Sequence, residues 1–222
     1  MRSDAPPLRV RRVPALSARV IGTVRGMSEN AASPQAYLDE SFREHPTSGI
    51  YVLAAAVIGP AVSVAARTLM LRLRGSRSTA KLHWSQMDRI QRKAATEEIA
   101  AVDGLHLIAI GSPVPRRRQE RARATCLAAL VPELSGVGVR HMRMEARTLV
   151  LDQRDVKTVV GARYALPKGA QLRIDHARGC DDPLLWVADI LAGAVRTHYD
   201  GDPTYRDILI NRIHEHNVAT GC

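Results

Sequence analysis

The chain has 222 residues, of which 45% are apolar and 4% aromatic, and its formal net charge is +10. This length suits one domain with a proper core, and the three widely spaced cysteines, without a Cys-x-x-Cys pair, argue against disulfides and a zinc site. No stretch approaches the roughly twenty apolar residues of a membrane helix, and no secretory signal follows the N-terminal arginines, so we expect a cytoplasmic protein that does not enter a membrane.

The first part of the chain differs in composition from the rest. Residues 1–33 are rich in Pro, Ser, Ala and Arg without a clear period, which predicts a basic tail that is disordered or adds a strand through Val20 and Ile21. Met27 offers a second start, so the residues before it are also consistent with an over-extended gene start. Residues 34–222 are expected to form a single domain.

Hydrophobic periodicity then predicts alternating strands and helices. Strands over 35–41 and 50–58 flank a loop with Pro46 and Gly49, which indicates a hairpin. The later predicted elements are a helix over 61–73, an extended stretch over 81–84, a helix over 85–101 capped by Ser85, a strand over 105–110 ended by Gly111-Ser112-Pro113, a helix over 116–134, a strand over 139–146, a helix over 153–164, a strand over 171–176 and a helix over 183–198. This order predicts an α/β domain, close to the α+β class, with a mixed sheet and helices on both faces.

Three carboxylates stand within or at the end of these apolar elements. Asp39 is near the end of the first strand, Glu145 near the end of the strand over 139–146, and Asp189 inside the last helix. Burying a carboxylate is costly unless it is paired or bound to a metal, so the three together predict a shared cation. Mg²⁺ and Mn²⁺ prefer oxygen ligands, and either ion fits a site made of carboxylates.

Each carboxylate also has a purely structural interpretation. Asp39 could cap a turn, Glu145 could pair with Arg143 or Arg147, and Asp189 could form a buried salt bridge. Further, weaker candidates are Glu40, which strand alternation turns to the face opposite Asp39, Asp152 and Asp155, which could replace Glu145, and Asp182, which could also reach the metals. Asp152 and Asp182 are equally well placed as N-caps of the helices that follow them.

Two segments resemble a known family. Asp39-Glu40-Ser41 with the apolar second strand, and residues 184–193 around Asp189, are similar to the two ends of the domain-of-unknown-function 3800 family, over roughly residues 35–199. The resemblance implies a ribonuclease H-like fold and an acidic site that would consist here of Asp39, Glu145 and Asp189. The family usually has glycine after Asp-Glu-Ser, and we expect Phe42 at this position to affect the turn more than the ligands.

Lys81-Leu82-His83-Trp84 resembles the basic element that similar chains carry between their first two helices. Alternation puts Lys81 and His83 on one side, where the lysine could hold a scissile phosphate and the histidine could assist proton transfer near neutral pH. The alternative is an exposed loop with Trp84 packed into the core.

The positive charge predicts a polyanionic partner, DNA or RNA. The candidate binding residues lie in two clusters, Arg74 with Arg77, and Arg116 with Arg117 and Arg118. The low aromatic content does not support binding of single strands through stacked bases. Together these features predict a nuclease that uses two divalent ions about 3.5–4 Å apart. The alternatives are a non-catalytic nucleic-acid-binding module on the same fold and a basic adaptor for an acidic protein.

Overall fold

The computed structural model describes residues 33–76 and 79–222, so the predictions for the first 32 residues and for Arg77 lie outside it. Its elements, in chain order, are β1 (Gln35–Arg43), β2 (Gly49–Ile58), α1 (Pro60–Arg74), a 3₁₀ turn (Trp84–Gln86), α2 (Arg89–Ala101), β3 (His106–Val114), α3 (Gln119–Gly136), β4 (His141–Glu145), α4 (Leu149–Arg163), β5 (Arg173–Ala177), α5 (Leu184–Tyr199), α6 (Thr204–Ile208) and β6 (Ile213–Ala219).

The strands form one mixed sheet in the order β5-β4-β1-β2-β3-β6. The predicted hairpin of β1 and β2 is confirmed, with Phe42 opposite Tyr51. Strand β2 is also antiparallel to β3, whereas β4 is parallel to β1, β5 to β4 and β6 to β3. Every strand except β2 therefore ends on the same side, which we call the carboxyl end of the sheet.

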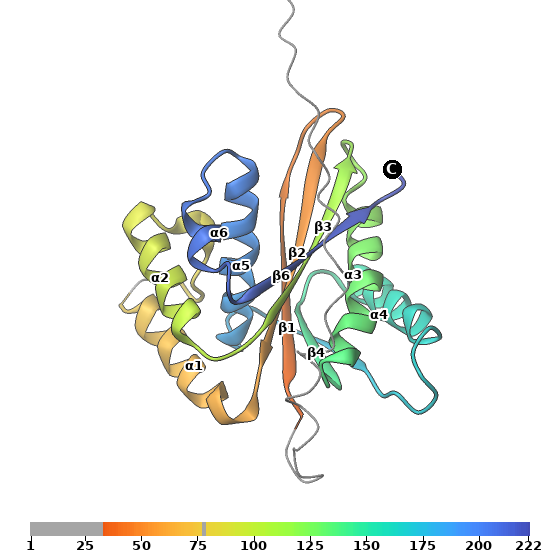
Figure 1. The fold of residues 1–222 in the computed structure, drawn as a ribbon, viewed down its shortest axis with the longest axis horizontal. Coiled ribbons are helices and arrows are strands. Elements are labelled where there is room, and N and C mark those ends of the chain that lie inside the picture. The colour runs from red at the N-terminus through yellow and green to blue at the C-terminus, as the bar shows by residue number, and fades with distance from the viewer. Residues whose placement is uncertain (1–32, 77–78) are drawn as a thin grey trace, which may run out of the picture. The chain divides into compact units, whose positions relative to one another are not determined.

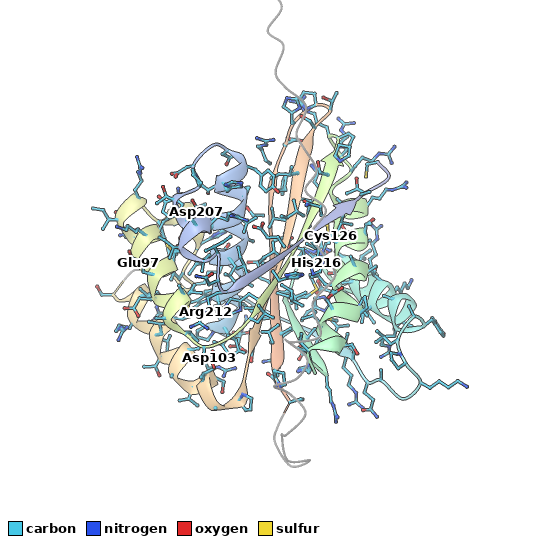
Figure 2. The ribbon with its side chains drawn as sticks, in the orientation of Figure 1. Glu97, Asp103, Cys126, Asp207, Arg212 and His216 are labelled. Atoms are coloured by element: carbon cyan, nitrogen blue, oxygen red, sulfur yellow. The ribbon has the colours of Figure 1, made fainter. Side chains whose placement is uncertain are left out.

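Helices cover both faces of the sheet, as predicted for an α/β domain: α1, α2, α5 and α6 lie on one face and α3 and α4 on the other (Figure 1). The side chains of β2 alternate between the two cores, with Val52 and Ala54 facing α5 and Leu53 and Ala55 facing α3. Cys126 of α3 lies in the second core (Figure 2). A strand buried on both faces explains the continuous apolar run from 50 to 58.

Helix α5 is the centre of the larger core. It packs on β1 and β2 and is covered by α1, α2 and α6, so nearly all its residues are buried, including Asp189. A helix that is apolar on every side is typical of such a position. No helix of the described ranges is both long enough and apolar enough to cross a membrane.

Several predicted boundaries were wrong because local capping and pairing decide them. Helix α2 is capped by Asp88, which forms a capping box with Gln91, whereas Ser85 lies in the 3₁₀ turn. Strand β3 continues through the Gly111-Ser112-Pro113 segment to Val114, because β2 and β6 both pair with it there.

Other differences concern where helices begin and which elements were not predicted. Helix α4 begins at Leu149 after Thr148, so Asp152 lies in its first turn and is not its N-cap. Phe42 continues β1 as far as Arg43 and does not form a turn. The short elements α6 and β6 were not predicted at all.

Candidate active site

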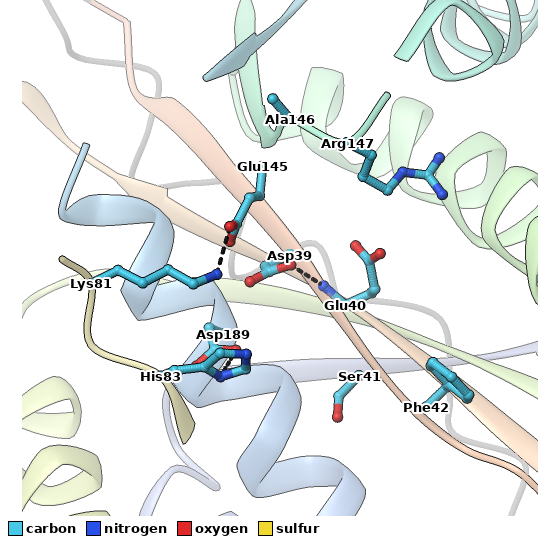
Figure 3. A pocket seen from close by; sticks show the side chains of 10 residues that line it. All are labelled: Asp39, Glu40, Ser41, Phe42, Lys81, His83, Glu145, Ala146, Arg147 and Asp189. Atoms are coloured by element: carbon cyan, nitrogen blue, oxygen red, sulfur yellow. Dashed lines mark hydrogen bonds and ion pairs between the residues drawn. The ribbon is translucent and has the colours of Figure 1, made fainter. Parts of the chain in front are cut away.

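A pocket of about 390 Å³ lies at the carboxyl end of the sheet (Figure 3). The residues predicted to be catalytic all line it: Asp39, Lys81, His83, Glu145 and Asp189. The topology accounts for this convergence. Parallel pairing of Leu38 with Met144 places the next residues of β1 and β4, Asp39 and Glu145, at the same level, and α5 packs against β1.

Asp39 is the most perturbed acid of the pocket. Its side chain is turned toward the α5 face of the sheet, only 8% of the residue is exposed, and its Oδ1 accepts a 2.8 Å hydrogen bond from the Glu40 backbone N–H. Burial raises the pKa of the Asp39 carboxyl well above its usual range, and the charges of Glu40, Asp189 and Glu145 raise it further. A divalent cation at this point would remove that penalty.

Asp189 is held by the loop that precedes α2. Its Oδ2 accepts a 2.6 Å hydrogen bond from the Trp84 backbone N–H, and its Oδ1 lies 3.0 Å from Nδ1 of His83. The hydrogen bond to Asp189 raises the pKa of His83 above its ordinary value, although partial burial opposes this. The imidazolium form of His83 is therefore favoured beside this carboxylate.

Glu145 is paired with Lys81, whose Nζ lies 2.5 Å from Oε1 of the carboxylate. Burial lowers the pKa of Lys81, but the hydrogen bond and charge of Glu145 outweigh burial and raise it overall. Gly179 lies in close contact with both side chains of this pair. A Cβ at this glycine would lie 2.7 Å from Glu145 Oε1 and 2.8 Å from Lys81 Cδ, so a larger residue would push both side chains.

The charge balance of the pocket follows from these contacts. Glu145 and Asp189 each face a cationic side chain, whereas Asp39 has no ion pair with any described residue. All three acids offer oxygen ligands only, which suits a hard divalent ion such as Mg²⁺ or Mn²⁺. The donor atoms are therefore of the kind that the predicted metal prefers, but the three carboxylates are not gathered within 4.8 Å of one another, and Glu145 and Asp189 are already paired with Lys81 and His83.

A second acidic group lies on the opposite face of β1. Asp152, Asp155 and His176 have ligand atoms within 4.8 Å of one another, the only such group in the described ranges. Asp155, however, accepts hydrogen bonds from Arg123 and Arg147. Burial opposes ionisation, yet His176 and the two arginines lower the pKa of Asp155 to about 2. Arginines already balance this group, so it needs no metal.

Arg123 also pairs with Glu40, which points away from Asp39 as the alternation predicts. Only 1% of Arg123 is exposed, and sequence reasoning missed its role. The signal was available, because Arg123 precedes the buried Cys126 and Leu127 by three and four residues and so shares their helix face. A buried arginine on that face needs an acidic partner.

Asp182, Arg74 and residues 116–118 do not line the pocket. Asp182 pairs with Arg67 and Arg143. Its Oδ1 accepts a hydrogen bond from the Leu184 backbone N–H, but the N-cap of α5 is Pro183, so the prediction of Asp182 as the N-cap was wrong by one residue. The guanidinium of Arg74, at the end of α1, lies 5.9 Å from the ring centroid of Trp186. Residues 116–118 are exposed between β3 and α3.

No protein-family model matches the chain, and no curated protein sequence matches it either. The resemblance to the domain-of-unknown-function 3800 family therefore stays a prediction that rests on its two short motifs.

Proposed function

We propose that this protein is a divalent-metal-dependent nuclease with a ribonuclease H-like core, acting on DNA or RNA. The observation that carries the proposal is the convergence of Asp39, Glu145 and Asp189, from three elements far apart in the sequence, in one pocket. Pockets that concentrate carboxylates until one of them has a strongly perturbed pKa are frequently functional.

Asp39, Glu145 and Asp189 are the residues that would hold Mg²⁺ or Mn²⁺. Divalent ions bound there supply a hydroxide near neutral pH and stabilise the departing oxygen of a phosphodiester. The cationic side chains of Lys81 and His83 would contact the substrate. Lys81 is placed to pair with a phosphate oxygen, and protonated His83, whose Nδ1 faces Asp189, leaves Nε2 to pass a proton to the leaving oxygen.

The surface around the pocket suits a polyanion. The loop with Arg116, Arg117 and Arg118 follows β3, which ends on the same side of the sheet as β1 and β4. Its exposed guanidinium groups would bind phosphates of a chain whose scissile bond lies in the pocket. Positive charge beside the acids also offsets their repulsion of the substrate.

One observation favours a second candidate, a non-catalytic nucleic-acid-binding module. The Lys81–Glu145 and His83–Asp189 pairs neutralise two of the three carboxylates without a metal. If side chains of the protein neutralise the carboxylates of the pocket, no divalent ion is needed there. The basic loop over residues 116–118 would then account for nucleic-acid binding by itself.

Cleavage assays separate the two candidates. Wild type, Asp39→Asn and Asp189→Asn should be incubated with single-stranded DNA, duplex DNA, RNA and a DNA–RNA hybrid, in Mg²⁺, Mn²⁺ or EDTA. The matched control is Asp103→Asn, because the side chain of Asp103, labelled in Figure 2, is 90% exposed and does not line the pocket. We expect metal-dependent cleavage by wild type and by the control, and binding without cleavage by the two pocket variants. Binding without cleavage by wild type would favour the second candidate.

A further inference from the structure

The pocket contains one exposed aromatic ring. Phe42, the only phenylalanine of the chain, lies on β1 three residues beyond Asp39, lines the same pocket, and is 47% exposed (Figure 3). None of the other exposed large apolar side chains in the described ranges lines this pocket. Isolated exposed apolar residues are common, so the place of this ring is more informative than its exposure.

The Phe42 side chain remains accessible to solvent at this end of β1. Phe42 and Glu40 share one face of β1, opposite to Asp39 and Ser41. Glu40 is drawn toward α3 by Arg123, whereas Phe42 lies beyond it, nearer the end of the strand. The ring therefore lies at the rim of the pocket, on the face of β1 opposite to the Asp39 side chain and outside the hydrogen-bond network of the acids.

The sheet places Phe42 between the basic loop and the acids. Phe42 is opposite Tyr51 of β2, and Tyr51 is opposite Gly111 of β3, the strand that leads into residues 116–118. Phe42, Tyr51 and Gly111 therefore lie at one level of the sheet, between the level of Asp39 and the loop. A polyanion that extends from this loop to Asp39 would pass Phe42. Asp39 and Phe42 are about 10 Å apart along the strand, and their side chains leave opposite faces of β1, so a base on the ring would belong to a nucleotide beside the one whose phosphate lies at the acids.

We propose that Phe42 is a stacking subsite for one unpaired nucleobase next to the scissile phosphate. This inference rests on the proposed nuclease function and narrows its substrate to single-stranded DNA or RNA, or to an unpaired end. A base inside a duplex is stacked between its neighbours and cannot offer its face, whereas every unpaired base can. The low aromatic content limits the subsite to one base, and the arginines supply the rest of the affinity.

Binding measurements with matched probes test the subsite. The probes are a thymidine oligonucleotide, an abasic oligonucleotide of the same length and a duplex, each with Ca²⁺ in place of Mg²⁺. The variants are Phe42→Leu, which keeps an apolar side chain without the ring, and Phe42→Trp, which keeps a ring. The control is Tyr164→Leu, because Tyr164 is an aromatic residue just after α4 that is 88% exposed and does not line the pocket.

We expect Phe42→Leu to weaken binding of the thymidine oligonucleotide about tenfold, the order of one lost base–aromatic stack, and to leave the abasic probe unaffected. Phe42→Trp should bind as well as wild type or better, and the control should be unchanged. Equal affinity of Phe42→Leu and wild type for the thymidine probe would overturn the subsite, as would equal losses on both single-stranded probes. Failure of wild type to bind the thymidine probe would do the same.

Cleavage measured in parallel keeps this inference apart from the proposed function. If Phe42→Leu shows the expected binding loss but wild type cleaves nothing, the subsite stands and the nuclease proposal fails. If wild type cleaves, Asp189→Asn does not, and Phe42→Leu binds and cleaves like wild type, the nuclease stands and the subsite fails.

Discussion

The backbone N–H of Trp84 donates a 2.6 Å hydrogen bond to the Asp189 carboxylate across 105 residues of sequence. The Trp84 ring is packed against α5 one turn further along, where a Cβ at Gly193 would lie 2.5 and 2.6 Å from Trp84 Cδ1 and Cδ2. The absence of a side chain at Gly193 thus allows the loop that carries Lys81 and His83 to lie against the helix that carries Asp189.

Replacing Gly193 with alanine should therefore disturb the site. We expect Gly193→Ala to lower the free energy of unfolding by roughly 1–3 kcal/mol through overpacking, measured by urea denaturation. The control Gly161→Ala, in α4, meets no heavy atom of the described residues within 4 Å, and should be about as stable as wild type or up to about 1 kcal/mol more stable. A Gly193→Ala protein as stable as the control would show that the contact is unimportant.

The buried Arg123 holds two carboxylates at once, Glu40 and Asp155. Arg123→Met should cost about 1.5–3 kcal/mol of unfolding free energy, because it removes charge-assisted hydrogen bonds from Glu40 and from buried Asp155, although Asp155 keeps Arg147 as a partner. Arg178→Met is the matched control, since Arg178 pairs with Asp181 at an exposed position, and it should change stability little. Similar small effects for both variants would contradict the structural role of Arg123.

The lowered pKa of His106 predicts how the free energy of unfolding depends on pH. Both its ring nitrogens lack a hydrogen-bond partner among the described residues, and burial, with a smaller effect of Arg212, lowers its pKa from 6.5 to about 4. In the unfolded chain the ring is protonated below about pH 6.5, so its contribution to stability is fully present above that pH and is lost as the pH falls to about 4. The loss amounts to roughly 3 kcal/mol.

Replacement of His106 by leucine should remove this part of the pH dependence. Unfolding free energies of wild type, His106→Leu and the partly exposed control His214→Gln should be compared between pH 7 and 4. We expect a flatter profile for His106→Leu alone. Parallel profiles for all three proteins would show that His106 does not titrate as the structure indicates.

The basic loop should determine how nucleic-acid binding depends on salt. Changing Arg116, Arg117 and Arg118 to alanine should weaken binding to all sequences and flatten the plot of log affinity against log salt, by close to one for each lost phosphate contact. The control removes three exposed basic side chains at the opposite end of the sheet: Arg140, Lys168 and Arg173. Equal effects of both triple variants would indicate nonspecific attraction, and binding of an acidic protein that persists at high salt would favour an adaptor.

The sequence predicted which carboxylates meet in one pocket better than it predicted the network around them. Asp39, Glu145 and Asp189 could be found because a carboxylate inside an apolar pattern is conspicuous. The partners of Arg123 could not be, because periodicity identifies the face of a helix but not which distant acid meets it. Helix α6 and strand β6 are short and polar, so they have little periodicity, and β6 is defined mainly by its pairing with β3.

The most direct test is anomalous diffraction from crystals soaked in Mn²⁺. We predict a manganese peak among the carboxylates of Asp39, Glu145 and Asp189, with Lys81 displaced from Glu145, and no such peak in Asp39→Asn crystals. A pocket without manganese at millimolar concentrations, or a peak only at Asp152, Asp155 and His176, would contradict the proposed metal-dependent site.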